Sequence, residues 1–280
     1  MHQKAEEILV LIKSYSTKII GDLTMSETSY QITNEQLKLM IDENTEGDFE
    51  PTLLRLILKN VISKRFVLDE RAKLISQFPL TAIFGSTIVD TSGRPTAKIE
   101  NDDEEGIAFT EMKKIIILGS GLFDLFLKEL LRKNNKSSQD VVDYIHKSPL
   151  FIPENKEILF KGIDAYLKED HITSVHLLVP QIESAFRNAV EYSGGNVLRE
   201  NRFDGFNYQT LDGLINNDNI KELFHDDSET IFYFRSVLSE PRGLNIRNDV
   251  CHGILRADDI NFSHSLLVVH VILLLAQIKY

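Results

Sequence analysis

Apolar residues recur at helical spacing through most of this 280-residue chain. In "FEPTLLRLILKNVISKRFVLDERAKLISQF" the apolar positions from Leu53 to Leu74 follow the i, i+3, i+4 spacing of one helix face. The same spacing returns in "FTEMKKIIILGSGLFDLFLKELLRK" and in "HLLVPQIESAFRNAVEYSGG". Because this pattern dominates, we expect a mainly α protein, with more than one helix in the first of these stretches.

One segment departs from the helical pattern. "LTAIFGSTIVDTSGRPTAKIEND" is rich in β-branched residues and has the turn signal "TSGRP" in its middle, so it predicts a small β-hairpin near residues 81–99. Ser, Asn and Pro accumulate between Lys133 and Asn155, which predicts a loop or a domain junction there. We therefore expect a helical N-terminal region with a hairpin over residues 1–150 and an all-helical bundle over residues 151–280.

Several residues in the C-terminal part predict where helices begin, end or break. Pro180 predicts a kink or a break near Val179, and a Gly-Gly pair is expected to end the same helix. Asn245 is a candidate N-cap for a helix from Ile246 to about Leu255. The stretch "LLVVHVILLLAQI" is the most apolar of the chain, but its 13 residues are too few to span a bilayer. We expect a buried helix, covered on most sides by its own domain or by a second subunit.

Charge and cysteine content restrict the possible function classes. The formal net charge is −11 and neither half is polybasic, so strong non-specific binding to nucleic acid is not expected. Cys251 is the only cysteine, which excludes an internal disulfide and fits a reducing compartment. The first residues do not have the pattern of a signal peptide. These features predict a cytoplasmic protein without a membrane segment.

Polar groups crowd together in "GLNIRNDVCHGIL". On a helix, Asn248 and His252 share a face, and the long side chain of Arg247 reaches round from the first turn. The planar guanidinium group of an arginine binds phosphate oxygens, and a histidine can both accept and donate a proton near neutral pH. These groups suit metal-independent cleavage of RNA, for which a two-fold dimer would supply the second histidine. The alternative is structural: Arg247 pairs with Asp249 or a nearby glutamate, and His252 belongs to the core.

The same stretch resembles a known superfamily. "RNDVCH" is similar to the R-x4-6-H signature of the HEPN superfamily, whose members are small helical bundles that dimerise and are often ribonucleases, and "RNDVCHG" is similar to the RNxxxHG signature of one uncharacterised branch. The resemblance also includes "HLLVPQIESAFRNAVEYSGG" and "RGLNIRND", and it covers roughly residues 154–280. It implies an HEPN-like C-terminal bundle that forms a homodimer, takes RNA as its substrate and uses neither a metal nor a cofactor.

The resemblance also implies roles for individual residues. Arg247 and His252 take the catalytic positions and Asn248 the polar position beside the arginine, with Asp249 as a supporting residue. Gly253 completes the signature and leaves room for a backbone or a substrate near His252. Two further supporting residues are Glu183 and Arg187, four apart on the preceding helix; the alternative for this pair is an ordinary surface ion pair. Ile254 stands where an HEPN subgroup controlled by a nucleotidyltransferase carries a tyrosine, so that form of control is not supported.

Two classes of function follow from this resemblance. The first is an HEPN endoribonuclease, a toxin or an antiviral defence effector that is held inactive until triggered, with a regulatory protein as a possible partner. The second is a non-catalytic HEPN-like module that mediates protein interactions or senses a nucleotide. Other candidate sites have simpler explanations: we expect "GSG" at residues 119–121 to be a small-residue helix contact, and the pairs Asp226–Asp227 and Asp258–Asp259 to be solvated or capping acids. His171 and His176 have poor spacing for a metal pair.

Overall fold

The computed structural model describes residues 31–79, 85–90, 93–225 and 227–279, together with a few positions between 6 and 15. The fold is mainly α, as the helical periodicity predicts. The longer helices are α2 (Asn34–Thr45), α3 (Phe49–Lys59), α4 (Lys64–Gln77), α5 (Glu104–Lys133), α7 (Lys156–Leu167), α8 (His171–Tyr192), α11 (Ser228–Leu238) and α13 (Phe262–Leu275). The shorter ones are α6 (Ser138–Ile145), α9 (Leu211–Ile215), α10 (Asp218–Leu223) and α12 (Ile246–Cys251), with the 3-10 turns η2 (Pro153–Asn155) and η3 (Ala257–Asp259).

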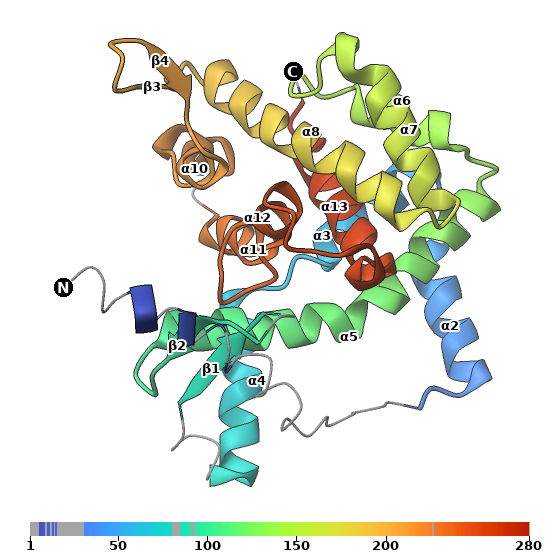
Figure 1. Ribbon diagram of the computed structural model, residues 1–280. Coiled ribbons are helices and arrows are strands. Elements are labelled where there is room, and N and C mark those ends of the chain that lie inside the picture. Colours follow the sequence, from blue (N-terminus) through green and yellow to red (C-terminus); the bar gives the residue numbers. More distant parts are fainter. Residues whose placement is uncertain are drawn as a thin grey trace.

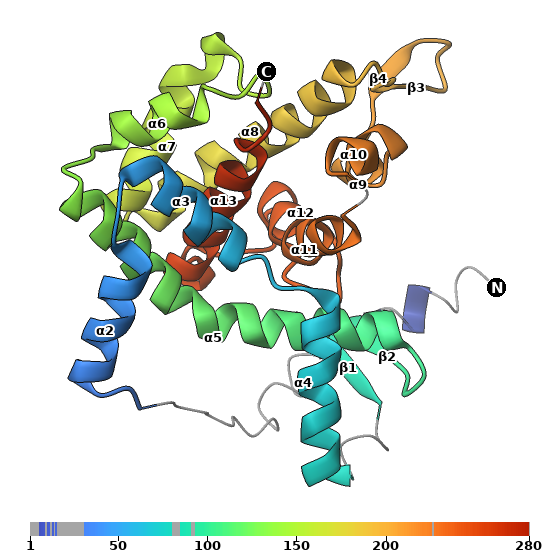
Figure 2. The same cartoon turned by 180° about the vertical axis from the view of Figure 1, so that it is seen from behind.

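Helix α13 lies at the centre of the molecule, where α5, α7 and α8 surround it in Figure 1 and α3 covers it in the reverse view of Figure 2. Every residue from Ser265 to Leu275 is buried. The apolar run is thus covered by helices of its own chain, which is the first of the two arrangements expected. Buried apolar side chains before and after residue 150 belong to one cluster, so the two parts share a core. A domain boundary at residue 150 stays a prediction.

Helix α5 crosses the molecule, and the predicted hairpin lies beside its N-terminal part (Figure 1). Its N-cap is Asp103, whose carboxylate accepts a hydrogen bond from the Gly106 N–H, and acids fill its first turn as the helix dipole favours. The hairpin pairs β1 (Ser86–Val89) with β2 (Pro95–Ile99) in antiparallel register, which confirms the prediction from the β-branched residues. Residues 81–84, 91 and 92 of the expected hairpin lie outside the described residues.

One expectation about the elements is wrong, and two others are confirmed in part. The stretch from Lys133 to Asn155 contains the predicted loop residues on either side of α6, which forms on a capping box between Ser137 and Asp140 and buries an apolar face. The C-terminal part is not wholly helical: β3 (Leu198–Glu200) and β4 (Phe206–Tyr208) pair in a second antiparallel hairpin. The "GSG" stretch contacts a neighbouring helix through Ser120, whose hydroxyl lies 3.0 Å from that of Ser263 in α13, whereas a Cβ added at Gly119 or Gly121 would meet no atom within 4 Å.

Helix α8 runs without a break through Pro180, although a break or kink was expected there. Pro180 lies on the exposed face of the helix, where water can solvate the carbonyl that loses its backbone partner. The helix ends at Tyr192, just before the Gly-Gly pair, as predicted. Among the described residues, the search for a helix with the length and apolar character needed to cross a membrane found none.

Candidate functional site

The polar stretch of the sequence forms α12, a six-residue helix that contacts both α8 and α11. The helix ends at Cys251 and not at Leu255 as predicted, because Gly253 adopts a left-handed φ of +63° that turns the chain. Ile254 and Leu255 then donate their backbone N–H groups back to the Asp249 carbonyl, at 2.8 and 3.1 Å. His252 therefore follows the last residue of the helix, at the C-cap position.

Asn245 stands at the N-cap position but does not cap the helix with its side chain. Its φ of 53° is left-handed, whereas a side-chain cap requires an extended backbone. Its amide instead donates to the Asp249 carboxylate at 2.9 Å, and its carbonyl oxygen accepts from the Asn248 amide at 2.8 Å. The sequence therefore predicted the position of the helix start correctly and the role of this side chain wrongly.

Arg247 is held by a carboxylate from α8. Its Nη2 and Nε atoms lie 2.7 and 3.0 Å from Oε2 of Glu183, and its Nη1 donates to Oδ1 of Asn248 at 3.1 Å. The side chains of Arg247 and Glu183 are 19% and 21% exposed, so solvent still reaches the pair. The structural alternative stated for Arg247, an ion pair with a nearby glutamate, is therefore present, but the guanidinium is not sealed from solvent.

Glu183 is shared between two arginines. Its other oxygen, Oε1, lies 3.6 Å from Nη2 of Arg187, which follows one turn later on α8. The Arg187 guanidinium also packs 4.3 Å from the centre of the Tyr208 ring, a contact that ties α8 to β4. Two guanidiniums and one carboxylate leave one formal positive charge beside α12, in a chain of net charge −11. We refer to Arg247, Arg187 and Glu183 as the arginine cluster.

His252 and Gly253 lie at the other end of α12 and both are exposed. Within the described part of the chain, no hydrogen bond or ion pair joins the His252 ring to Arg247. A Cβ at Gly253 would meet no atom within 4 Å, so the space beside His252 is open. Hydrogen bonds and ion pairs thus connect Arg247, Asn248, Glu183 and Arg187, and among the described residues none of them extends to the His252 ring.

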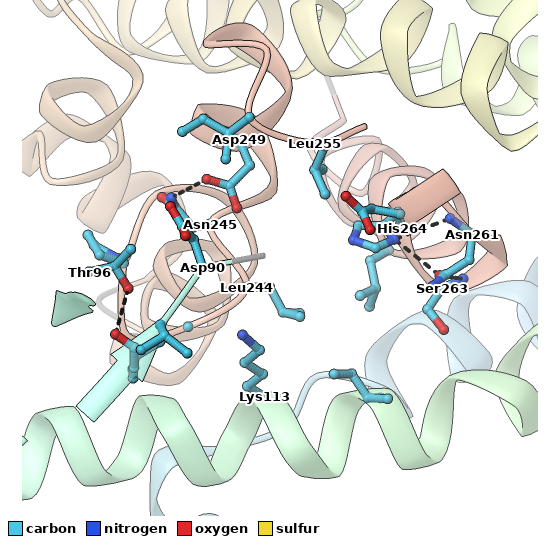
Figure 3. A pocket seen from close by; sticks show the side chains of 18 of the residues that line it. Asp90, Thr96, Lys113, Leu244, Asn245, Asp249, Leu255, Asn261, Ser263 and His264 are labelled. Carbon is cyan, nitrogen blue, oxygen red and sulfur yellow. Dashed lines mark hydrogen bonds between the residues drawn. The ribbon is translucent and has the colours of Figure 1, made fainter. Parts of the chain in front are cut away.

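Asp249 follows Arg247 by two residues, so it lies on the opposite side of α12, and it lines a cavity of about 770 Å³ (Figure 3). The cavity lies between the hairpin β1–β2, α5, the residues that flank α12, and the start of α13. Lys113 of α5 extends into it from below, and His264 of α13 lies on its far side (Figure 3). Its apolar wall includes Ile88, Val89, Ile117, Leu244, Leu255 and Leu267.

Burial shifts the pKa values of three of the titratable groups that line this cavity. Burial lowers the pKa of the Lys113 ammonium, and the nearby Asp249 carboxylate partly opposes that change. Burial raises the pKa of Asp249, against the hydrogen bond from Asn245 and the charge of Lys113. Burial also lowers the pKa of His264, and the positive charge of Lys113 adds to the effect. Such groups with perturbed pKa values in a cavity are typical of functional sites.

Sequence reasoning missed Lys113 and His264. Lys113 stands four residues after Phe109 and three before Ile116, both buried, so it interrupts an apolar helix face. That interruption is a signal the sequence contains, although it does not say what lies opposite. His264 appears in the sequence only as a histidine near the start of the last helix. Its position across the cavity from Asp249 depends on how α12 and α13 are placed.

The remaining candidates have structural partners. His171 Nδ1 lies 2.9 Å from the Ser265 hydroxyl, and His176 Nδ1 lies 2.8 Å from the Ile172 carbonyl. Asp258 and Asp259 lie on the cavity wall, and Asp259 also accepts from the Arg256 N–H at 3.3 Å. Asp226 lies outside the described residues. Among the residues that are described, no three His, Cys, Asp or Glu side chains are grouped as a metal site requires.

The chain was compared with protein families, curated proteins and solved structures. No family model, no curated protein and no solved structure matches this chain. The HEPN resemblance of residues 247–253 therefore stays a prediction that depends on the motif and its surroundings.

Proposed function

We propose that this chain is a metal-independent endoribonuclease of the HEPN type that acts as a homodimer, with Arg247 and His252 of both subunits around one phosphate. The observation that carries the proposal is the geometry of α12, which has a half-buried, oriented arginine at one end and an exposed histidine at the other. The proposed setting is a cytoplasmic toxin or antiviral defence effector under the control of a regulatory partner.

The chemistry requires two proton-transfer groups on opposite sides of the phosphate. A base takes the proton of the ribose 2′-hydroxyl, whose oxygen forms a bond to phosphorus. The bond from phosphorus to the 5′-oxygen breaks, and an acid protonates that oxygen as it leaves. One imidazole does not reach both sides, so the His252 side chains of two subunits would divide the roles, while Arg247 stabilises the charge on the phosphorane.

Charge and exposed aromatic side chains support an RNA substrate. The arginine cluster keeps one formal positive charge in an acidic chain, which favours a phosphate at this position over the rest of the surface. The hairpin β3–β4 is joined to the cluster through Arg187 and Tyr208, and it exposes Phe203 and Phe206 to 76% and 64%. Aromatic rings beside arginines are typical of surfaces on which single-stranded bases stack.

The test compares purified wild type with His252→Ala and Arg247→Ala on single-stranded RNA in the presence of a chelator. Loss of the general acid–base group is expected to lower the cleavage rate by about 10²-fold or more, with unchanged helix content and subunit association. Arg247→Lys keeps the positive charge but removes the planar guanidinium with its paired N–H donors, so partial activity is expected. His176→Ala is the matched control, because His176 is exposed and its Nδ1 bonds to the Ile172 carbonyl of its own helix. Equal activity in wild type and both alanine variants would reject the proposal.

The alternative is a non-catalytic HEPN-like module, and the contact that favours it is the Arg247–Glu183 pair. A guanidinium already bound by a carboxylate braces α12 against α8 without any substrate. In that case both Arg247 variants lower the melting temperature and no RNA is cleaved by any form of the chain. A nucleotide-sensing module would instead show a rise in melting temperature when a nucleotide is added.

A further inference from the structure

Two charged groups face each other across the cavity without forming an ion pair. Lys113 points into it from α5 and Asp249 from α12, as Figure 3 shows. Within the described parts of the chain, the Lys113 ammonium has neither a hydrogen bond nor an ion pair. Its neighbour Lys114, by contrast, is exposed and paired with Glu111 at 2.8 Å. An uncompensated, half-buried ammonium costs free energy unless an acceptor reaches it, so a ligand oxygen at this place would be stabilising.

Asp249 offers the complementary group. Its Oδ1 accepts from Asn245 at 2.9 Å, and this hydrogen bond fixes the carboxylate in the orientation seen in Figure 3. The described chain supplies no hydrogen-bond donor to Oδ2, which leaves that oxygen for a ligand. The cavity therefore presents a donor on one side and a fixed carboxylate on the other, with apolar side chains between them.

The other charges on the cavity wall argue against a phosphate. Asp258 and Asp259 place two carboxylates on the wall, and the one arginine, Arg94, pairs with Asp90 at 2.9 Å. A phosphate beside Lys113 would be repelled by these carboxylates. A neutral, flat ligand with an apolar face and polar edges avoids that repulsion and still uses both Lys113 and Asp249. A volume of about 770 Å³ accommodates a base with its ribose.

We propose that this cavity binds a guanine base, with Lys113 donating to the base oxygen O6 and Asp249 accepting from N1–H and the 2-amino group. Guanine is the RNA base that places two adjacent donors beside a carbonyl, so its edge matches a carboxylate and an ammonium together. The inference deepens the proposed function, on which it rests, because a guanosine held here, on the opposite side of α12 from the arginine cluster, would select where the strand is cut. Binding of the free nucleoside tests the cavity independently of cleavage.

The experiment is isothermal titration calorimetry of the full chain with guanosine, inosine, adenosine, cytidine and uridine. Guanosine is expected to bind at least tenfold more tightly than adenosine, cytidine or uridine. Inosine, which lacks the 2-amino group, is expected to fall between them. Lys113→Met and Asp249→Asn are each expected to weaken guanosine binding by about tenfold or more, which corresponds to loss of one charge-assisted hydrogen bond. Lys114→Met is the matched control, and melting curves of all variants verify folding.

The outcomes separate the two proposals. Guanosine binding that depends on Lys113 but not on Lys114 supports the base pocket even if the chain cleaves no RNA, in which case the nuclease proposal alone fails. No nucleoside binding, equal binding of all five, or unchanged affinity in Lys113→Met overturns the base pocket, even if RNA is cleaved. For an active enzyme, cleavage of RNA oligonucleotides next to guanosine, with the preference lost in Asp249→Asn, is the expected companion result.

Discussion

At the scale of single residues, the core contains a histidine that makes hydrogen bonds through both ring nitrogens. His270 of α13 accepts from the Tyr233 hydroxyl at Nδ1, 2.6 Å away, and donates from Nε2 to the Ile57 carbonyl at 2.9 Å. These bonds join α13 to α11 and α3. Burial lowers the pKa of His270 to about 4. Burial therefore keeps the His270 ring unprotonated at neutral pH.

That pKa makes stability depend on pH in a defined window. In the unfolded chain the ring takes up a proton near its ordinary pKa of 6.5, whereas the folded chain resists until about 4. Stability from this group is thus complete above about pH 6.5 and falls as the pH is lowered toward 4, by about 3 kcal/mol. Urea unfolding at pH 7.5, 5.5 and 4.5 measures the slope of the free energy of unfolding against pH. His270→Gln is expected to flatten the slope and His176→Gln to leave it unchanged; equal slopes in all three chains would contradict the assignment.

The arginine cluster yields a second prediction at this scale. Glu183→Gln removes the carboxylate shared by Arg247 and Arg187, so we expect the free energy of unfolding to fall by about 2 kcal/mol, the range for hydrogen bonds to charged groups. The matched control is Glu157→Gln, whose pair with Lys161 is exposed, so that its loss should leave the free energy of unfolding nearly unchanged. Urea denaturation measures both. If the two losses are equal, Glu183 does not brace α12.

At the scale of elements, the chain that leads into α12 packs closely on α11. The Leu244 N–H donates to the Ser236 carbonyl at 2.7 Å, and a Cβ added at Gly243 would lie 2.3 Å from that same oxygen. A backbone atom has no alternative rotamer, so any side chain at Gly243 forces the two segments apart. The position of α12, and with it the positions of Arg247 and Asp249, depends on this contact.

Two glycine substitutions test that dependence. Gly243→Ala is expected to lower the free energy of unfolding by about 2 kcal/mol or more through steric overlap. Gly119→Ala, in the middle of α5 where a Cβ meets open space, is expected to raise it by about 0.5–1 kcal/mol through helix propensity. Chemical denaturation should therefore show a lower free energy of unfolding for Gly243→Ala and a higher one for Gly119→Ala. The same sign in both variants would show that the close approach at Gly243 is not the controlling feature.

At the scale of the whole molecule, the proposed nuclease requires two copies of the chain. In one subunit Arg247 and His252 are not joined, and the space beside His252 is open. A composite site predicts that specific activity falls on dilution, when dimers dissociate. Sedimentation velocity and cleavage rates measured over the same concentration range should change together. Constant specific activity across a range in which the mass changes from dimer to monomer would contradict the composite site.

The sequence by itself determined the helical class, the first hairpin and the burial of the last helix, because these follow from local periodicity, turn residues and a long apolar run. It also placed Arg247, Asn248, Asp249 and His252 on one short segment. Only the tertiary structure decided their partners: Glu183 reaches Arg247 because α8 passes beside α12, and Lys113 faces Asp249 because α5 lies below it. Such pairings depend on how distant segments pack, for which neither spacing nor propensity carries a signal. The course of α8 through Pro180 and the α6 helix were decided in the same way, by solvent access and burial that local residue preferences do not contain.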